Sequence, residues 1–268
     1  MIQYIEDTNK TYDDAIKKIL RGHNAKYSNN KLSVERYVYK ANAAFFYGGL
    51  YSHYFWDWVS ISDVIYDSAE TIKHLMLEVI KLYNNKAVGI KTFTLVKAIS
   101  DDLVEAGFVL NKSYRVGKTT YYNLEYMFDR EINSDPLVYH SDEKDTRYKG
   151  QLERFKQKHN LNEDPTPYDV VALKDNLCVG GVLAQCYEDV IYVSHLAVSK
   201  DYRLLSIGRT LMHKVAEHAK KNGYDSIMLG TTSFQAKGFY EKLGYKVVFE
   251  RNNCPKNSIS YTMVLELV

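Results

Sequence analysis

The sequence predicts a mixed α/β fold in which one unit of strands and helices occurs twice. In each half a Gly-Gly pair precedes an apolar strand, at Gly48-Gly49 in the first half and at Gly180-Gly181 in the second. The strand at residues 59–66 aligns with residues 191–198 without a gap. Apolar strands that alternate with amphipathic helices are typical of α/β domains with a mixed sheet.

The repeat continues beyond the strands. Residues 72–80 match a helix at residues 208–216, and the segment that ends in Gly107-Phe108 matches the one that ends in Gly244-Tyr245. Matches that occur in the same order at a nearly constant spacing are the signature of an internal repeat. The chain is therefore expected to contain two similar domains.

The division between these domains is expected near the middle of the chain. We predict one domain at residues 1–134 and the other at residues 135–268, joined by the polar stretch 131–145. Each domain is expected to begin with a helix, at residues 13–20 in the first and 149–159 in the second.

Composition bounds the class of protein. The 268 residues are 46% hydrophobic and 25% charged, with a net charge of +2, as in globular proteins that do not bind nucleic acid or acidic membranes through bulk charge. No apolar run is long enough to span a membrane, and the N-terminus lacks the pattern of a signal peptide. The three cysteines show no metal-binding spacing, and the histidines form no close pair, so we expect reduced thiols, a cytoplasmic protein and no metal site.

A phosphate-binding turn is the main functional feature of the second half. An apolar strand ends near Val198, the chain turns, and an amphipathic helix begins near Ile207. The free N–H groups and the dipole of a helix N-terminus favour anions, Gly208 permits close approach, and Arg203 and Arg209 add positive charge. Without further context, the same residues could form an ordinary strand-to-helix turn with two surface arginines.

Residues 189–245 resemble the GCN5-related N-acetyltransferases (GNAT). The phosphate loop of that family reads Arg/Gln-x-x-Gly-x-Gly/Ala, and here it runs from Arg203 to Gly208 with Ser206 in place of the first Gly. A later family pattern reads Asn-x-x-Ala-x-x-Leu/Phe-Tyr-x-x-x-Gly-Phe. Here it begins at Ser233, which replaces Asn, and ends at Gly244-Tyr245.

The resemblance implies two tandem acyl-CoA N-acyltransferase (GNAT) folds, with acetyl-CoA as the acyl donor of the second. It places a backbone pairing with the pantetheine arm on one strand, a pyrophosphate cradle on the loop, and a proton donor to the leaving thiolate at Tyr240. The implied cofactor-binding residues are Leu196, Ala197, Val198, Arg203, Leu204, Leu205, Ser206, Ile207, Gly208, Arg209, Ser233, Ala236, Phe239 and Tyr240.

The general base is less clearly marked. Strand alternation places Tyr192, Ser194 and Leu196 on one face and His195 on the other. Family members that carry a base on this strand have it at the position of Tyr192 or Ser194, so these two are candidates, with Glu188 or Asp189 as the proton acceptor through water. His195 is expected to pack behind the sheet, although a β-bulge would change the alternation.

The first half lacks these features. Its loop has lost the Arg and the Gly, and Asp67 and Glu70 would repel a pyrophosphate. Leu103 stands where the second half has Tyr240. We therefore expect residues 1–134 to be a degenerate, non-catalytic copy. Its aromatic residues at 45–58 are expected to pack in its core and against the other half, and the alternative is that some of them line a substrate cleft between the halves.

The sequence thus predicts an acetyl-CoA-dependent N-acetyltransferase that moves an acetyl group to a primary amine by direct attack in a ternary complex. The acceptor is a small molecule or a peptide, and the protein is a monomer or a homodimer. A non-catalytic acyl-CoA sensor is the alternative, suggested by Ser206, Ser233 and the missing base. An aminoacyl transferase of the peptidoglycan-bridge type is disfavoured, because such enzymes do not need the loop from Arg203 to Gly208.

Overall fold

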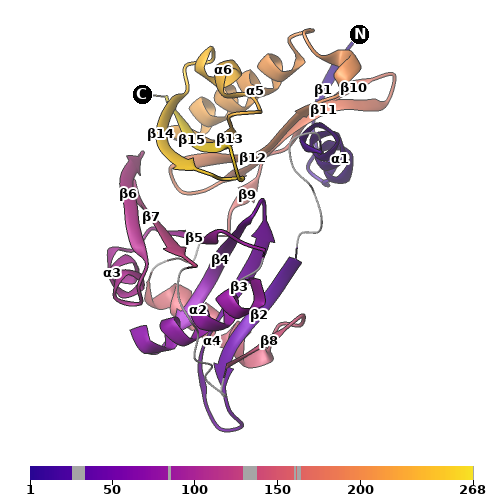
Figure 1. The fold of residues 1–268 in the computed structure, drawn as a ribbon. Helices are drawn as coiled ribbons and strands as arrows, with labels where there is room; N and C mark the ends of the chain where they lie inside the picture. Colours follow the sequence, from indigo (N-terminus) through magenta and orange to yellow (C-terminus); the bar gives the residue numbers. More distant parts are fainter. Residues whose placement is uncertain (26–33, 84–85, 129–137, 160, 162–163, 268) are drawn as a thin grey trace.

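Two mixed β-sheets with helices on their faces make up the protein (Figure 1). The computed structural model describes residues 1–25, 34–83, 86–128, 138–159, 161 and 164–267. Within these residues no helix is both long and apolar enough to cross a membrane.

Sheet 1 has seven strands and is formed mainly by the first half of the chain. Its strand order is β6-β7-β5-β4-β3-β2-β8. The strands are β2 (Val34–Ala41), β3 (Phe46–Phe55), β4 (Trp58–Tyr66), β5 (Gly89–Thr94), β6 (Val109–Val116), β7 (Thr119–Met127) and β8 (Val138–Ser141). Its helices are α2 (Ala69–Tyr83), α3 (Lys97–Glu105) and α4 (Thr146–Lys158).

Sheet 2 has eight strands and is formed mainly by the second half. Its strand order is β1-β10-β11-β12-β13-β15-β14, with the short β9 beside β11. The strands are β1 (Gln3–Glu6), β9 (Thr166–Pro167), β10 (Val170–Lys174), β11 (Leu177–Cys186), β12 (Val190–Val198), β13 (Ser226–Thr232), β14 (Lys246–Asn252) and β15 (Ile259–Glu266). Its helices are α1 (Asp13–Asn24), the 3-10 helix η1 (Lys200–Tyr202), α5 (Ile207–Asn222) and α6 (Lys237–Glu241).

The two sheets share one strand order and one pattern of strand directions. In each, a single parallel pair, β4–β5 or β12–β13, lies among antiparallel neighbours. The register around the Gly-Gly pairs is also the same. Gly48 lies opposite Lys40 and Tyr66, and Gly180 lies opposite Ala172 and Val198. The repeat seen in the sequence therefore corresponds to a repeat in the strand pairing.

The sheets exchange their first strand and helix, which the sequence did not predict. β1 pairs with β10 and α1 packs on β11 and β12, so the N-terminal segment completes sheet 2. β8 pairs with β2 and α4 packs on β3 and β4, so a segment of the second half completes sheet 1. The expectation that residues 131–145 only connect two domains is wrong, because β8 lies within them. The predicted boundary between residues 134 and 135 lies outside the described residues.

The Gly-Gly pairs make room for the exchanged helices. A Cβ atom on Gly181 would lie 2.3 Å from Cδ1 of Ile16 on α1, and one on Gly49 would lie 2.9 Å from Cδ2 of Tyr148 on α4. Ile16 and Tyr148 are both fully buried. Close packing of each exchanged helix on its sheet therefore requires a residue without a side chain at these two strand positions.

Helix α5 covers the opposite face of sheet 2 from α1. Its apolar residues Leu211, Val215 and Ala219 recur every four residues and are fully buried, as the sequence predicts. The helix ends at Gly223, which adopts φ 77° and donates its N–H to the last turn. This is the glycine C-cap that its spacing predicts.

Each half also extends a hairpin onto the other half (Figure 1). The β6–β7 hairpin packs Val116 and Tyr121 against sheet 2. In return, the turn after β14 accepts a hydrogen bond at Asn253 O from Trp58 Nε1, 2.8 Å away. Trp56 stacks edge-on against Phe234, with ring centroids 5.7 Å apart. Part of the aromatic run therefore packs between the halves, as the sequence predicts.

We predict that Gly181→Ala lowers the free energy of unfolding by about 1–3 kcal/mol, because the added methyl group overlaps Ile16. Thermal or urea unfolding monitored by circular dichroism measures this. Gly22→Ala in α1 is the control, since nothing lies within 4 Å of a Cβ there and alanine favours a helix. Equal stability of the Gly181→Ala variant and the wild type would contradict the proposed role of this glycine.

Candidate functional site

The candidate site lies where β12 and β13 separate. These parallel strands pair over four residues and stop pairing after Val193. Beyond that point β12 continues to Val198 and β13 to Thr232. The edge of β12 at residues 196–198 therefore has no neighbouring strand on this side. An open strand edge presents N–H and C=O groups that can pair with an extended ligand.

A β-bulge marks the point of separation. Across the ladder with β11, Leu183 lies opposite His195 and Ala184 lies opposite Val193, so Ser194 is an extra residue. A bulge bends its strand and re-aims the side chains that follow it.

The bulge reverses the predicted alternation of β12. Val193 and Leu196 both pack in the core beneath α5, whereas Tyr192 packs on the opposite face. His195 lies on that opposite face too, near charged residues of α1. The predicted grouping of Tyr192 with Leu196 is therefore wrong, because Ser194 adds one residue to the repeat of two.

The hydrogen bonds of Ser194 determine which ring nitrogen of His195 carries the proton. Ser194 Oγ donates to Leu183 O at 3.1 Å, which uses its one hydroxyl proton. His195 Nδ1 lies 3.0 Å from the same Oγ and must therefore be the donor in that contact. This tautomer leaves the lone pair on Nε2, and the described residues offer no hydrogen-bond partner to that atom.

The surroundings of His195 keep its ring neutral. Burial lowers the pKa of His195 below its usual 6.5, and the positive charges of Lys17 and Arg21 lower it further, while Asp13 opposes them. At neutral pH the imidazole is thus able to accept a proton.

The predicted phosphate loop, residues 203–209, has the geometry of an anion site. Leu204 and Ser206 adopt left-handed conformations, with φ of 64° and 61°. Ser206 does so at the place where the resembled family has a glycine, the residue that tolerates this conformation best. The first helical hydrogen bond runs from Thr210 N to Ser206 O, so the N–H groups of residues 207–209 have no acceptor within the helix.

The side chains of the loop are mostly exposed. Leu204, Leu205, Ser206 and Arg209 all lie at the surface, and Leu204 is fully accessible. Arg203 folds back on the sheet, where its Nε donates to Val198 O at 3.1 Å. The loop therefore offers backbone amides rather than side chains as its main donors.

Helix α1 contributes contacts that local sequence patterns do not reveal. His23 Nδ1 lies 3.5 Å from Arg203 Nη1, and the buried Asn24 accepts a hydrogen bond from Gln235 Nε2 at 2.9 Å. The end of α1 thus touches both motifs of the site. The sequence feature that points to these contacts is the internal repeat, because each repeated unit is expected to have a first helix that packs on its sheet.

The second motif follows β13 and includes α6, and the ring of Phe239 on that helix reaches the loop. A Cβ atom on Gly208 would lie 3.4 Å from Cζ of Phe239. Ser233 exchanges hydrogen bonds with Ile259 at the start of β15, and Ala236 N donates to the Thr231 hydroxyl at 3.3 Å. Ser233 and Ala236 thus shape the turn, whereas Phe239 packs on the start of α5.

Tyr240, which follows Phe239 in this motif, is buried beneath α5. It is 7% exposed, and its ring meets those of Phe239 and Tyr245 at centroid distances of 5.1 and 5.7 Å. Burial raises the pKa of Tyr240 above the usual value of a phenol, so the hydroxyl stays protonated at neutral pH. It can therefore act as a donor.

Of the predicted catalytic residues, Tyr192 lies in the paired part of β12, one residue before the last pair, and Glu188 lies before the strand begins. Tyr192 packs in the cluster formed with Val116 and Tyr121 of the first half. Glu188 is exposed at the turn before β12, about 20 Å along the strand from Ser194 at 3.3 Å per residue. The structure therefore does not bring Glu188 to Ser194.

Comparison with known proteins identifies the region that holds this site. Residues 128–245 match the sequence model of the acetyltransferase (GNAT) family. The chain contains a GNAT acetyltransferase domain. The open edge of β12, the loop at residues 203–209 and Tyr240 all lie within the matched residues.

Individual relatives match over shorter segments. N-acetylaspartate synthetase of Xenopus tropicalis is 39% identical over 82 residues, which are 29% of this chain and 30% of the relative. Streptothricin acetyltransferase A of Bacillus subtilis (strain 168) is 34% identical over 71 residues, 25% of this chain and 41% of the relative. The matched segments thus span less than half of these relatives. A crystal structure of an acetyltransferase from Bacillus cereus ATCC 14579 aligns at a TM-score of 0.43 and 22% identity, covering 48% of this chain and 98% of the other.

Among the described residues, a buried hydroxyl without a hydrogen-bond partner lies at the candidate site, at the end of β13. Thr232, the last residue of β13, is 2% exposed, and its Oγ1 has no hydrogen-bond partner in the described part of the chain. Regular alternation along β13 places Thr232 on the face of Met228, which is also the face of Tyr192 and His195. Buried polar groups are normally paired, so this atom fits a site that is completed by a ligand or by water. Over the same residues there is no group of metal-binding side chains.

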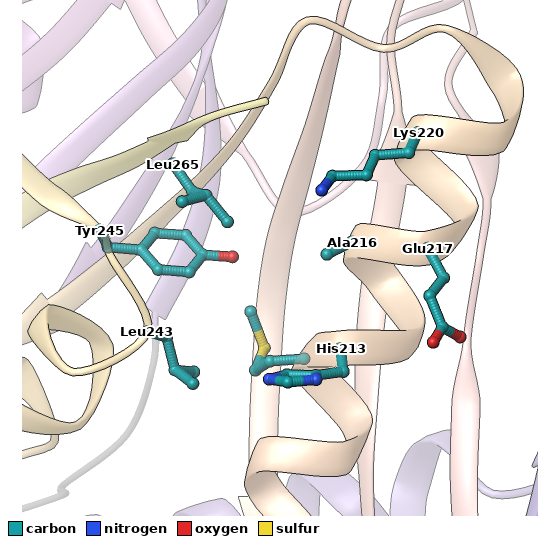
Figure 2. A pocket seen from close by; sticks show the side chains of 8 residues that line it. His213, Ala216, Glu217, Lys220, Leu243, Tyr245 and Leu265 are labelled. Carbon is teal, nitrogen blue, oxygen red and sulfur yellow. The ribbon is translucent and has the colours of Figure 1, made fainter. Parts of the chain in front are cut away.

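A separate cavity of about 260 Å³ lies beside α5 and is not part of this site (Figure 2). It is lined by α5, by the segment between α6 and β14 and by β15, at Met212, His213, Ala216, Glu217, Lys220, Leu243, Tyr245 and Leu265. Tyr245 is 3% exposed and directs its hydroxyl toward the helix, yet that oxygen has no partner among the described residues.

We predict that Tyr245→Phe raises the free energy of unfolding by about 1 kcal/mol, because it removes an unsatisfied buried hydroxyl. The midpoint of thermal unfolding should rise by about 2–4 °C. Tyr148→Phe is the control with the opposite sign, since Tyr148 donates to Asp63 O at 2.6 Å. An unchanged or lower midpoint for Tyr245→Phe would show that bound water already satisfies the hydroxyl.

Proposed function

We propose that the GNAT domain, completed by β1 and α1, is an acetyl-CoA-dependent N-acetyltransferase. The observation that carries this proposal is a juxtaposition at the separation of β12 and β13. There, an unpaired strand edge at residues 196–198 runs toward the free amides of residues 207–209. An extended arm that ends in a pyrophosphate is a ligand that matches both.

The chain's own residues fit this donor. The backbone of Leu196, Ala197 and Val198 would pair with the pantetheine arm, and the amides of residues 207–209 would hold the pyrophosphate. Bound acetyl-CoA would supply a thioester whose carbonyl carbon is open to attack by an amine. Gly208 packs beside Phe239, which would fix the start of α5 against the motif at residues 233–240.

Two side chains would move the protons of the transfer. A protonated amine has a pKa of about 10.4 and must lose a proton before it can attack. His195 Nε2 would accept that proton, with Ser194 orienting the ring. As the new N–C bond forms and the C–S bond breaks, Tyr240 would give its proton to the leaving thiolate. The acceptor would be a primary amine of a small molecule or a peptide.

The first half would be a related copy without this chemistry. Support comes from its strand order, which repeats that of sheet 2, and from the start of α2, where the equivalent loop would lie. There, Asp67 Oδ1 accepts a hydrogen bond from Thr71 Oγ1 at 2.5 Å. A carboxylate thus already occupies the positive end of α2, where a second anion would be repelled.

Gly208→Glu should abolish the binding of acetyl-CoA, as measured by isothermal titration calorimetry. A carboxylate at this helix start is compatible with folding, because it interacts favourably with the helix dipole and a Cβ meets only ordinary contacts. It would repel the pyrophosphate. Asn222→Glu is the matched control, since it adds one negative charge at the far end of α5. The proposal fails if the wild type does not bind acetyl-CoA at millimolar concentration.

His195→Gln should lower kcat by at least about a hundredfold and leave the KM for acetyl-CoA unchanged, because it removes the base and not the donor site. In the wild type, activity should fall as the pH drops through an apparent pKa below 6.5, where the ring becomes protonated. The variant should lose this acidic limb. Wild-type turnover by the variant would assign the base to another group. Initial rates measured across pH 5–9 with a panel of amines provide the test.

A further inference from the structure

The turn between β6 and β7 contacts the second half through hydrogen bonds to one carboxylate, that of Asp189. Lys118 N donates to Asp189 Oδ2, and Thr119 Oγ1 donates to Asp189 Oδ1 at 3.3 Å. Asp189 is 6% exposed, so these are two donors from the first half to a buried carboxylate of the second. Hydrogen bonds to a charged, buried group are among the stronger ones in proteins.

The same turn reaches the start of the neighbouring strand. Asp189 immediately precedes β12 and Asp225 immediately precedes β13. Asp225 N donates to Asp189 O at 2.9 Å, and Lys118 Nζ lies 3.7 Å from Asp225 Oδ2. The turn therefore contacts β12 and β13 at their N-terminal ends, where the two strands are paired.

Close packing fixes the position of the turn. Gly117 has φ 56°, and a Cβ there would lie 2.6 Å from Asp189 Oδ2, so only glycine fits. On either side of the turn, Val116 and Tyr121 pack against Val190 and Met228, which belong to the paired part of β12 and β13. The hairpin thus holds the paired segments as well as their starts.

We propose that the β6–β7 turn sets the separation of β12 and β13, with Asp189 as a positioning residue for the acetyl-CoA site. The inference rests on the proposed function. The two strands share four paired residues before they separate at Ser194, so a small rotation at their starts changes the gap further along. Small displacements of binding groups have large effects on catalysis. In this way the first half, which lacks a phosphate loop, would shape the site of the second.

The repeat supplies a matched control for this contact. Asp57, which immediately precedes β4, accepts a hydrogen bond from Lys256 N at 3.3 Å and gives its own carbonyl to Val88 N at 2.7 Å. The turn after β14 thus contacts the residue that joins the starts of β4 and β5, as the β6–β7 turn contacts the starts of β12 and β13. Asp57 lies in the turn before β4 of sheet 1, far along the chain from the loop at residues 203–209.

The experiment compares Asp189→Ala with Asp57→Ala in the full-length protein. We expect Asp189→Ala to weaken acetyl-CoA binding about tenfold in calorimetry, and Asp57→Ala to change it by less than about twofold, although both should lower the thermal midpoint. Thr119→Val, which removes one of the two donors, is the milder variant if Asp189→Ala does not fold. Its binding should weaken by a smaller factor.

Hydrogen exchange tests the inference without a ligand. Asp189→Ala should raise amide exchange at residues 194–198 and 203–209, and Asp57→Ala should not. If the wild type binds no acetyl-CoA, the proposed function fails and exchange alone decides on the positioning role. Equal effects of the two variants on binding or on exchange at these residues would overturn the inference, as would wild-type behaviour of a folded Asp189→Ala.

Discussion

The contact between Gly181 and Ile16 is the constraint on which the arrangement of the two halves depends. Helix α1 belongs to the first half of the chain but lies on sheet 2, so close to β11 that no side chain fits between them at Gly181. The equivalent contact of Gly49 with Tyr148 holds α4 on sheet 1. Because each sheet receives one of its covering helices from the other half, neither half has a complete two-faced sheet by itself. The exchange therefore joins the halves into one cooperative unit.

The candidate site depends on this arrangement, because residues of the first half contact it from two sides. The end of α1 contacts the predicted phosphate loop at Arg203 and the second motif at Gln235, and charged residues of the same helix act electrostatically on His195. From the other side, the β6–β7 turn holds the start of β12 at Asp189. Residues from three distant parts of the chain thus meet at one pair of strands, although the motifs occupy only the last part.

Local features of the fold could be predicted from the sequence because they depend on neighbours along the chain. The apolar stripe of α5 and its glycine cap at Gly223 belong to this class. The exchange of β1–α1 with β8–α4 could not be predicted, since an amphipathic helix packs equally well on either of two similar sheets. The position of the β-bulge at Ser194 could not be predicted either, because one extra residue in a strand does not change the composition of the segment. The bulge places His195 on the same face as Tyr192, which packs against the β6–β7 hairpin.

The two halves share their scaffold, including the equivalent contacts at Asp57 and Asp189, and differ at the starts of α2 and α5. Both sheets have the same strand order, the same parallel pair and a partner turn at the start of that pair. The helix starts differ. At α5 three backbone amides lack a helical acceptor, whereas at α2 the carboxylate of Asp67 lies at the positive end. Since the scaffolds agree and these few residues do not, the proposed binding of an anionic donor would depend on the start of α5 rather than on the fold that carries it.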